Sequence, residues 1–151
     1  MIMSKILKKD ELLEIQKNVD PFLMMDEVEI VSENKVVGKK KFDEKFSIFR
    51  YHWPGDPNVP AAYQIETMSQ VASIIILSRP EHKKSTFLVV AADKLKFKKK
   101  ILPNNTLTVE ANLKSFKRGL ASFEVRANLD NNFCCSGQFT MILQEEYNKF
   151  L

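Results

Sequence analysis

One long segment, residues 61–77, constrains the fold more than any other part of this chain because it is apolar on almost every side. It reads AAYQIETMSQVASIIIL and lies between Pro60 and Arg79-Pro80. Proline suits the first position of a helix and stops a helix beyond its end. Since a helix that is apolar on most sides must be wrapped by other elements, the sequence predicts a buried central helix over 60–78.

Runs that alternate apolar with charged residues flank this segment, as half-solvated antiparallel strands do. The predicted strands cover residues 23–31, 36–42, 86–92, 94–101, 106–116, 120–129 and 133–143. Within the N-terminal segment 1–17, residues 5–17 predict a short amphipathic helix. No linker, repeat or low-complexity tract interrupts the pattern. We therefore expect one domain over residues 1–151, an α+β fold whose antiparallel sheet wraps a long central helix.

Charge and hydropathy exclude few classes of partner. The chain has 23 Lys and Arg against 19 Asp and Glu, and this mild excess is spread over the whole length. It permits an acidic partner without requiring one. No stretch is long and apolar enough to span a membrane, and the N-terminus lacks the apolar run of a signal peptide. We expect a cytoplasmic protein with no membrane contact.

The two cysteines, Cys134 and Cys135, are adjacent. Neighbours in a strand point to opposite faces, so the sequence predicts one core thiol, one outward thiol and no disulfide between them. No spaced group of histidines and cysteines accompanies them. We expect neither a metal site nor a cofactor.

A proline-rich loop precedes the central helix and carries the first candidate for chemistry. Residues 51–60 read YHWPGDPNVP, which excludes regular structure and predicts a rigid, ordered loop. His52 lies at the head of this loop, and Glu66 is the only carboxylate of the helix, about 9 Å along its axis from Pro60. Unpaired N–H groups are expected at 61–63.

These parts suit the removal of a proton alpha to a carbonyl. His52 is the candidate base, and the helix N–H groups would hold the enolate oxygen. Glu66, protonated in apolar surroundings, would donate to a leaving hydroxyl. Two structural alternatives stay open: His52 packs among aromatic residues, or Glu66 lies on an exposed helix edge beside Gln70.

The run His52-Trp53-Pro54-Gly55-Asp56-Pro57-Asn58-Val59-Pro60, followed by Glu66, resembles the signature of the β-hydroxyacyl-[acyl-carrier-protein] dehydratases of the FabZ/FabA type. In that family the loop reads G-H-F-P-G-x-P-x-x-P-G, and the helix carries E-A-M-A-Q where this chain has ETMSQ at 66–70. Further matches are Pro21-Phe22-Leu23 with Asp26, the strand Asp93-Lys94-Leu95-Lys96-Phe97, and Pro103. The resemblance covers roughly residues 11–144.

The resemblance implies a hotdog fold and dehydration of 3-hydroxyacyl thioesters on acyl carrier protein to trans-2-enoyl thioesters, in fatty acid or related acyl-chain synthesis. It implies a homodimer that joins two sheets, in which His52 of one subunit and Glu66 of the other are catalytic and no cofactor is needed. A trimer of dimers is common among the relatives, and the sequence does not decide it. The residues implied around the substrate are Tyr51, Trp53, Gly55, Ala61, Ala62 and Gln70.

Three departures from the family pattern concern the site itself. Tyr51 and Ala61 stand where the family has glycine, and Trp53 stands where it usually has phenylalanine. Phe87-Leu88 occupies the region of a family tyrosine. These changes predict an unusual acyl chain, or reduced or lost activity.

A lysine-rich strand allows two interpretations. Strand alternation would place Lys94, Lys96 and Lys98 on one face, either as a solvated surface or as a docking patch for the acidic carrier protein. Nucleic-acid binding is not expected, since Phe97 alone makes no stacking platform. Two rival functions stay open for the whole chain: a thioesterase or hydratase acting on coenzyme A esters, and a degenerate, non-catalytic acyl-binding protein.

Overall fold

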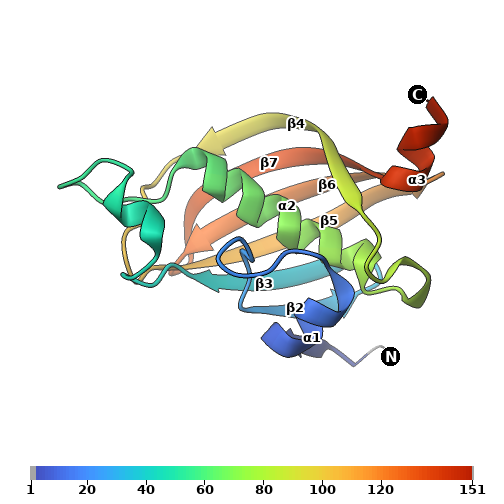
Figure 1. Ribbon diagram of the computed structural model, residues 1–151, viewed down its shortest axis with the longest axis horizontal. Helices are drawn as coiled ribbons and strands as arrows, with labels where there is room; N and C mark the ends of the chain where they lie inside the picture. The colour runs from blue at the N-terminus through green and yellow to red at the C-terminus, as the bar shows by residue number, and fades with distance from the viewer. Residues whose placement is uncertain (1–2, 151) are drawn as a thin grey trace.

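The computed structural model, which describes residues 3–150, places one antiparallel sheet around one long helix (Figure 1). The strands are β1 (Lys5–Lys8), β2 (Glu27–Ser32), β3 (Lys35–Lys41), β4 (Phe87–Phe97), β5 (Thr106–Lys117), β6 (Leu120–Leu129) and β7 (Asn132–Leu143). The helices are α1 (Lys9–Ile15), α2 (Ala61–Leu77) and α3 (Gln144–Tyr147), with 3₁₀ turns η1 (Ser47–Arg50), η2 (Pro80–His82) and η3 (Asn148–Phe150). The strand order is β1-β2-β3-β5-β6-β7-β4.

Helix α2 lies along the concave face of this curved sheet (Figure 1). Twelve of its side chains are buried, as the apolar composition predicted. It approaches β3 so closely at Gly38 that a Cβ there would lie 2.7 Å from Val71 Cγ2. Glycine is therefore required at this contact. The arrangement confirms the α+β class and the hotdog fold.

The prediction of a helix from residue 5 is wrong for its first turn. Lys5–Lys8 forms β1, and α1 covers only Lys9–Ile15. The four residues pair with the outer edge of β2, where Leu7 is buried opposite Val28. An open strand edge satisfies the backbone of a short segment that an isolated helix would hold only weakly.

Strand β4 corrects a second prediction, because one strand replaces the two expected at 86–92 and 94–101. Its register with β7 shifts between Asp93 and Lys96, and Lys94 has a φ of 50°. Such a bulge adds a residue to one strand and breaks the alternation of faces. Lys94, Leu95 and Lys96 therefore border one groove, and the lysines do not lie opposite the apolar residue between them.

The adjacent cysteines are both fully buried, so the prediction of one outward thiol is wrong. The register of β6 and β7 shifts between Ala127 and Asn128, directly opposite this pair. The bulge lets both thiols face the interior. Cys134 Sγ donates to the Lys99 carbonyl at 3.6 Å, and contact with Cys134 together with burial raises the pKa of Cys135.

Candidate active site

The loop 51–60 and η1 project beyond the end of the sheet (Figure 1). The loop bonds largely to itself and to its neighbours: the His52 N–H donates to the Ile48 carbonyl at 2.8 Å, and the Asp56 N–H to the Trp53 carbonyl at 2.8 Å. Trp53 and Gly55 have φ values of 57° and 90°. These contacts and dihedral angles give the ordered, irregular loop that the prolines predicted.

His52 is half-buried within this loop. Its Nδ1 lies 2.9 Å from the carbonyl oxygen of Asn58, and its ring stacks on Trp53 with 4.9 Å between centroids and 22° between planes. Since a carbonyl only accepts, Nδ1 is the donor of this bond. In the neutral ring, Nε2 then keeps its lone pair and can accept a proton.

Asn58 holds the carbonyl that orients the histidine, a role that the sequence analysis missed. The side chain is buried, and its Nδ2 donates to the Asp56 carbonyl at 2.9 Å. An asparagine between two prolines of an ordered loop is a signal for such a local bond, because its amide can satisfy the turn backbone.

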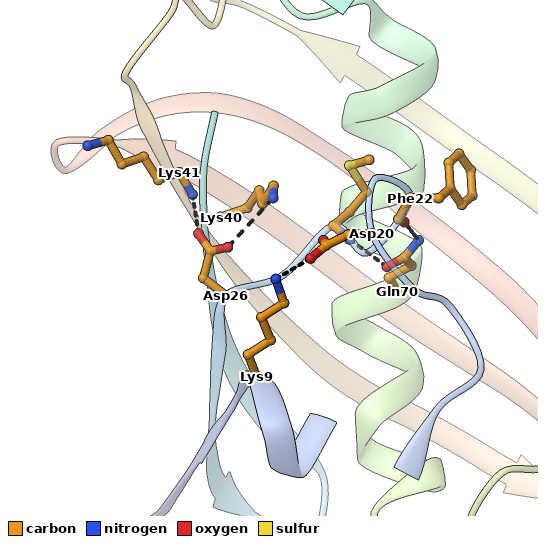
Figure 2. Close-up of polar contacts among 8 residues, drawn as sticks. Lys9, Asp20, Phe22, Asp26, Lys40, Lys41 and Gln70 are labelled. Atoms are coloured by element: carbon orange, nitrogen blue, oxygen red, sulfur yellow. Dashed lines mark hydrogen bonds and ion pairs between the residues drawn. The ribbon is translucent and has the colours of Figure 1, made fainter. Parts of the chain in front are cut away.

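Glu66 is half-buried on α2, and its Oε1 accepts a hydrogen bond from Gln70 Nε2 at 2.8 Å. Gln70 is buried and uses its whole amide: Nε2 also donates to the Phe22 carbonyl at 2.8 Å, and Oε1 accepts from the Met24 N–H at 2.8 Å. Figure 2 shows Gln70 reaching from α2 to the Phe22 backbone. The carboxyl is thereby oriented by a segment distant in the sequence.

The segment that holds Gln70 is itself fixed at both ends (Figure 2). Lys9 pairs with Asp20, and this contact raises the pKa of Lys9. The Lys41 N–H donates to Asp26 at 2.6 Å, and Lys40 Nζ lies 3.6 Å from the same carboxylate. The Lys9–Asp20 pair is exposed, so it contributes at most about 1 kcal/mol, whereas Lys40 is largely buried beside the exposed Asp26. Together these contacts restrain the backbone to which Gln70 is hydrogen-bonded.

A cavity of about 370 Å³ lies beside Glu66. Its lining residues are Gln16, Lys17, Asn18, Glu66, Ser69, Gln70, Ser73, Leu77, Ser85, Thr86, Phe87, Leu88, Val89 and Met141. The prediction of apolar surroundings for Glu66 is wrong, because hydroxyl and amide side chains share this wall. The spacing of Ser69 and Ser73, three and seven residues after Glu66, was the signal that they share its helix face.

The structure does not bring all predicted site residues together within one chain. No loop residue lines the cavity beside Glu66, and the rings of Tyr51 and Trp53 are 68% and 56% exposed rather than plugging it. Gly55 is exposed on the loop. His52 and the Glu66 cavity therefore belong to separate parts of the protomer.

The start of α2 presents two of the three predicted N–H groups. Ala61 and Ala62 are exposed, and no described backbone bond involves their N–H groups. The Tyr63 N–H donates to the Pro60 carbonyl at 3.0 Å, so the prediction that this group is unpaired is wrong. The first hydrogen bond of the helix therefore forms one residue earlier than expected, at Tyr63. Only the N–H groups of Ala61 and Ala62 could still donate to a ligand oxygen.

The lysines at positions 94, 96 and 98 are exposed, and none of them takes part in the ion pairs found among residues 3–150. Within the same described range, no three His, Cys, Asp or Glu side chains cluster as metal ligands would. No helix of that range combines the length and hydropathy needed to cross a membrane.

Comparisons with solved structures identify related folds. A dehydratase heterocomplex from Xenorhabdus doucetiae, ApeI:P, matches with a TM-score of 0.78 and 16% identity, covering 92% of this chain and 95% of that one. A hypothetical thioesterase with coenzyme A from Streptococcus pneumoniae matches with a TM-score of 0.60 and 16% identity, covering 77% and 83%. At these identities the likeness shows the hotdog fold alone.

Comparisons of sequence identify the family as well as the fold. The 3-hydroxyacyl-[acyl-carrier-protein] dehydratase FabZ of Lactococcus lactis is 30% identical over 135 residues, covering 89% of both chains. The FabZ of Clostridium perfringens is 32% identical over 129 residues, covering 85% of this chain and 93% of the relative. The model of the FabA-like domain matches residues 18–138. The loop, the central helix and most of the sheet fall within this match, and the chain belongs to the FabA-like family.

Proposed function

We propose that this protein dehydrates 3-hydroxyacyl thioesters carried on acyl carrier protein to trans-2-enoyl thioesters, in fatty acid or related acyl-chain synthesis. The observation that carries the proposal is the pair of oriented groups: His52 with its Nε2 available, and Glu66 with one carboxyl oxygen held by Gln70. The FabZ enzymes that it resembles over most of its length support the same reaction.

In this reaction His52 removes the proton alpha to the thioester carbonyl. The bond from Nδ1 to the Asn58 carbonyl fixes the tautomer and stabilises the charge that develops on the ring. The thioester oxygen faces the N–H groups of Ala61 and Ala62, whose position at the start of α2 favours negative charge.

Glu66 completes the elimination by protonating the departing 3-hydroxyl group. Gln70 binds Oε1, which leaves Oε2 of the acid as the atom that delivers the proton. The remaining predicted contacts, Tyr51, Trp53 and Gly55, would border the thioester from the loop side.

The proposal includes a homodimer formed through β4, because this strand is an open edge of the sheet. It has 11 residues, and Val89, Val90 and Phe97 are exposed on it. A long edge with apolar side chains favours pairing with another strand. The opposite edge, β1, is short and rich in lysine, which disfavours such pairing.

Antiparallel pairing of β4 with the same strand of a second subunit would also bring together the two catalytic groups, which lie apart within one protomer. The loop is joined to residues just beyond the end of β4: the Val59 N–H donates to the Ile101 carbonyl at 2.9 Å, and Lys100 Nζ lies 2.6 Å from Asp56. The Glu66 cavity borders the start of β4, at 87–89. Twofold pairing sets the end of one strand beside the start of the other. It would bring His52 of the partner subunit to the cavity.

The decisive experiment follows enoyl-thioester absorbance with crotonyl and longer acyl carrier protein substrates. We expect His52→Ala and Glu66→Gln each to lower kcat by roughly 10²- to 10⁴-fold, because positioned acids and bases contribute on that scale. Circular dichroism of each variant checks that it folds. Equal, background rates in wild type and both variants would refute the dehydratase.

We propose the lysines at 94, 96 and 98 as the docking patch for acyl carrier protein. Their exposure, and their absence from the ion pairs found among residues 3–150, suit an acidic partner. Glu110 and Glu124 line the same groove as Lys94 and Lys96 and would compete with that partner. Lys96→Glu and Lys98→Glu should raise KM several-fold for carrier-protein substrates but leave KM for pantetheine thioesters unchanged. Equal KM changes for both substrates would contradict docking. A cytoplasmic location remains a prediction.

A further inference from the structure

The cavity beside Glu66 follows one face of α2. Glu66, Ser69, Gln70, Ser73 and Leu77 all line it and lie on the same side of the helix. From Glu66 to Leu77 the face extends about 16 Å along the axis. A substrate whose reacting carbon lies at Glu66 would direct the rest of its acyl chain along this face.

The polar side chains Ser69, Gln70 and Ser73 lie on this face of α2. Ser69 Oγ donates to the Glu66 carbonyl at 3.0 Å, and Ser73 Oγ donates to the Gln70 carbonyl at 2.6 Å. Each hydroxyl donates its one hydrogen to a helix carbonyl, so only its oxygen lone pairs, directed away from the helix backbone, can form a further hydrogen bond. Both serines are buried, and their hydroxyls give this side of the cavity wall a polar character.

The far end of the cavity carries a positive charge. Lys17 and Thr86 both line it, and Lys17 Nζ donates to Thr86 Oγ1. The ion pairs found among residues 3–150 include no carboxylate partner for Lys17. The ammonium has three donors and uses one here, so it can bind an acceptor that arrives from inside the cavity.

The backbone that carries Lys17 is held in place on both sides. Lys84 Nζ donates to the Gln16 carbonyl at 2.9 Å, and the Lys84 N–H donates to the Ile15 carbonyl at 3.0 Å. The buried Gln16 side chain bonds to the backbone of Asn18 in both directions, at 2.7 and 2.6 Å. Lys17 thus belongs to a segment that is fixed on both sides, and it lines the same cavity as Glu66.

We propose that this site selects acyl thioesters whose far end is a carboxylate, which Lys17 and Thr86 bind, over thioesters that end in methyl. The inference rests on the proposed dehydratase function and narrows its substrate class. A methyl terminus offers no acceptor to Lys17 or Thr86, whereas a carboxylate accepts hydrogen bonds from both.

The test compares substrates of equal carbon number: 3-hydroxydecanoyl with 3-hydroxysebacyl pantetheine, and 3-hydroxyoctanoyl with 3-hydroxysuberyl pantetheine. For at least one pair, the wild type should favour the carboxylate-ended substrate in kcat/KM by roughly tenfold to a hundredfold. Lys17→Met should remove or reverse that preference. Lys83→Met, which removes a nearby lysine that does not line the cavity, should leave it unchanged.

Equal or better turnover of the methyl-ended substrates, with no effect of Lys17→Met, would overturn the inference and leave the dehydratase standing. If no substrate is turned over, the dehydratase fails instead, and calorimetry still decides the inference. In that measurement, unreactive decanoyl and sebacyl pantetheine amides are titrated into wild type and Lys17→Met. Tighter sebacyl binding that is lost in Lys17→Met supports the carboxylate site, and equal binding refutes it.

Discussion

His52 and Glu66 are supported by different kinds of structure. His52 takes its orientation from Asn58 and Trp53, which lie in the same short loop. Glu66 is held by Gln70, whose other bonds reach Met24 and Phe22, 46 and 48 residues away in the sequence. The orientation of His52 therefore depends on local backbone geometry, and that of Glu66 depends on the packing of α2 against a distant segment. Substitutions around His52 should therefore lower activity alone, whereas substitutions around Glu66 should lower both activity and the free energy of unfolding.

The largest effect should come from mixing the His52 and Glu66 variants. His52→Ala and Glu66→Gln are each expected to be nearly inactive, but a heterodimer of the two contains one site with both groups intact if each site spans two subunits. Random mixing should restore about a quarter of wild-type activity. Co-expression with two different affinity tags isolates the heterodimer for assay. Absence of any recovery, with dimers formed, would place both groups in one subunit.

Gln70→Ala should damage both stability and activity, because it acts at the distant contact. The Phe22 carbonyl and the Met24 N–H lose their partner, which costs about 2–3 kcal/mol in the free energy of unfolding measured with urea. Loss of Glu66 orientation should lower kcat roughly tenfold.

The matched control for Gln70 is Gln64→Ala on the same helix. Gln64 is also buried, but its Oε1 has no hydrogen-bond partner among residues 3–150, and its Nε2 makes a long bond of 3.3 Å to the Val59 carbonyl. It should lose less stability and keep its kcat. An equal loss of kcat in both variants would mean that Gln70 acts through general stability.

Trp53→Ala should have the smallest effect, confined to activity. An aromatic pair is worth about 0.5–1.5 kcal/mol, so loss of the stack on His52 should lower kcat roughly threefold to tenfold. The melting temperature should change little because the ring is 56% exposed. Trp53→Phe keeps a ring against His52 and should retain most activity. Unfolding of Trp53→Ala at a clearly lower temperature would show that the stack supports the fold as well.

Much of the site was predictable where it depends on local sequence. The prolines of 51–60 predicted an ordered loop, and the apolar run with its single carboxylate predicted α2 and the position of Glu66 on it. The surroundings of Glu66 were predicted wrongly. Ser69 and Ser73 share its face through helical spacing, but Gln16 and Thr86 reach the cavity from segments that no spacing rule connects to α2.

The wrong predictions about strands share one cause, which is that pairing with a neighbouring strand overrides the local sequence pattern. Lys5–Lys8 became a strand because β2 offered an open edge, and the bulges beside Asp93 and Asn128 changed which side chains face inward. A bulge inserts one residue, and because strand faces alternate with every residue, one insertion reverses the pattern beyond it. Local alternation cannot reveal where a neighbouring strand imposes such a shift.

The sequence by itself determined the helix–sheet composition, the rigid loop and the identity of the two candidate catalytic groups, since these follow from residue types and spacing along the chain. Only the tertiary structure decided what surrounds Glu66, where both cysteines point and that His52 lies outside the Glu66 cavity of its own protomer. Those features depend on contacts between segments far apart in the sequence, and their free energy comes from packing and hydrogen bonds that exist only once the sheet has closed around α2.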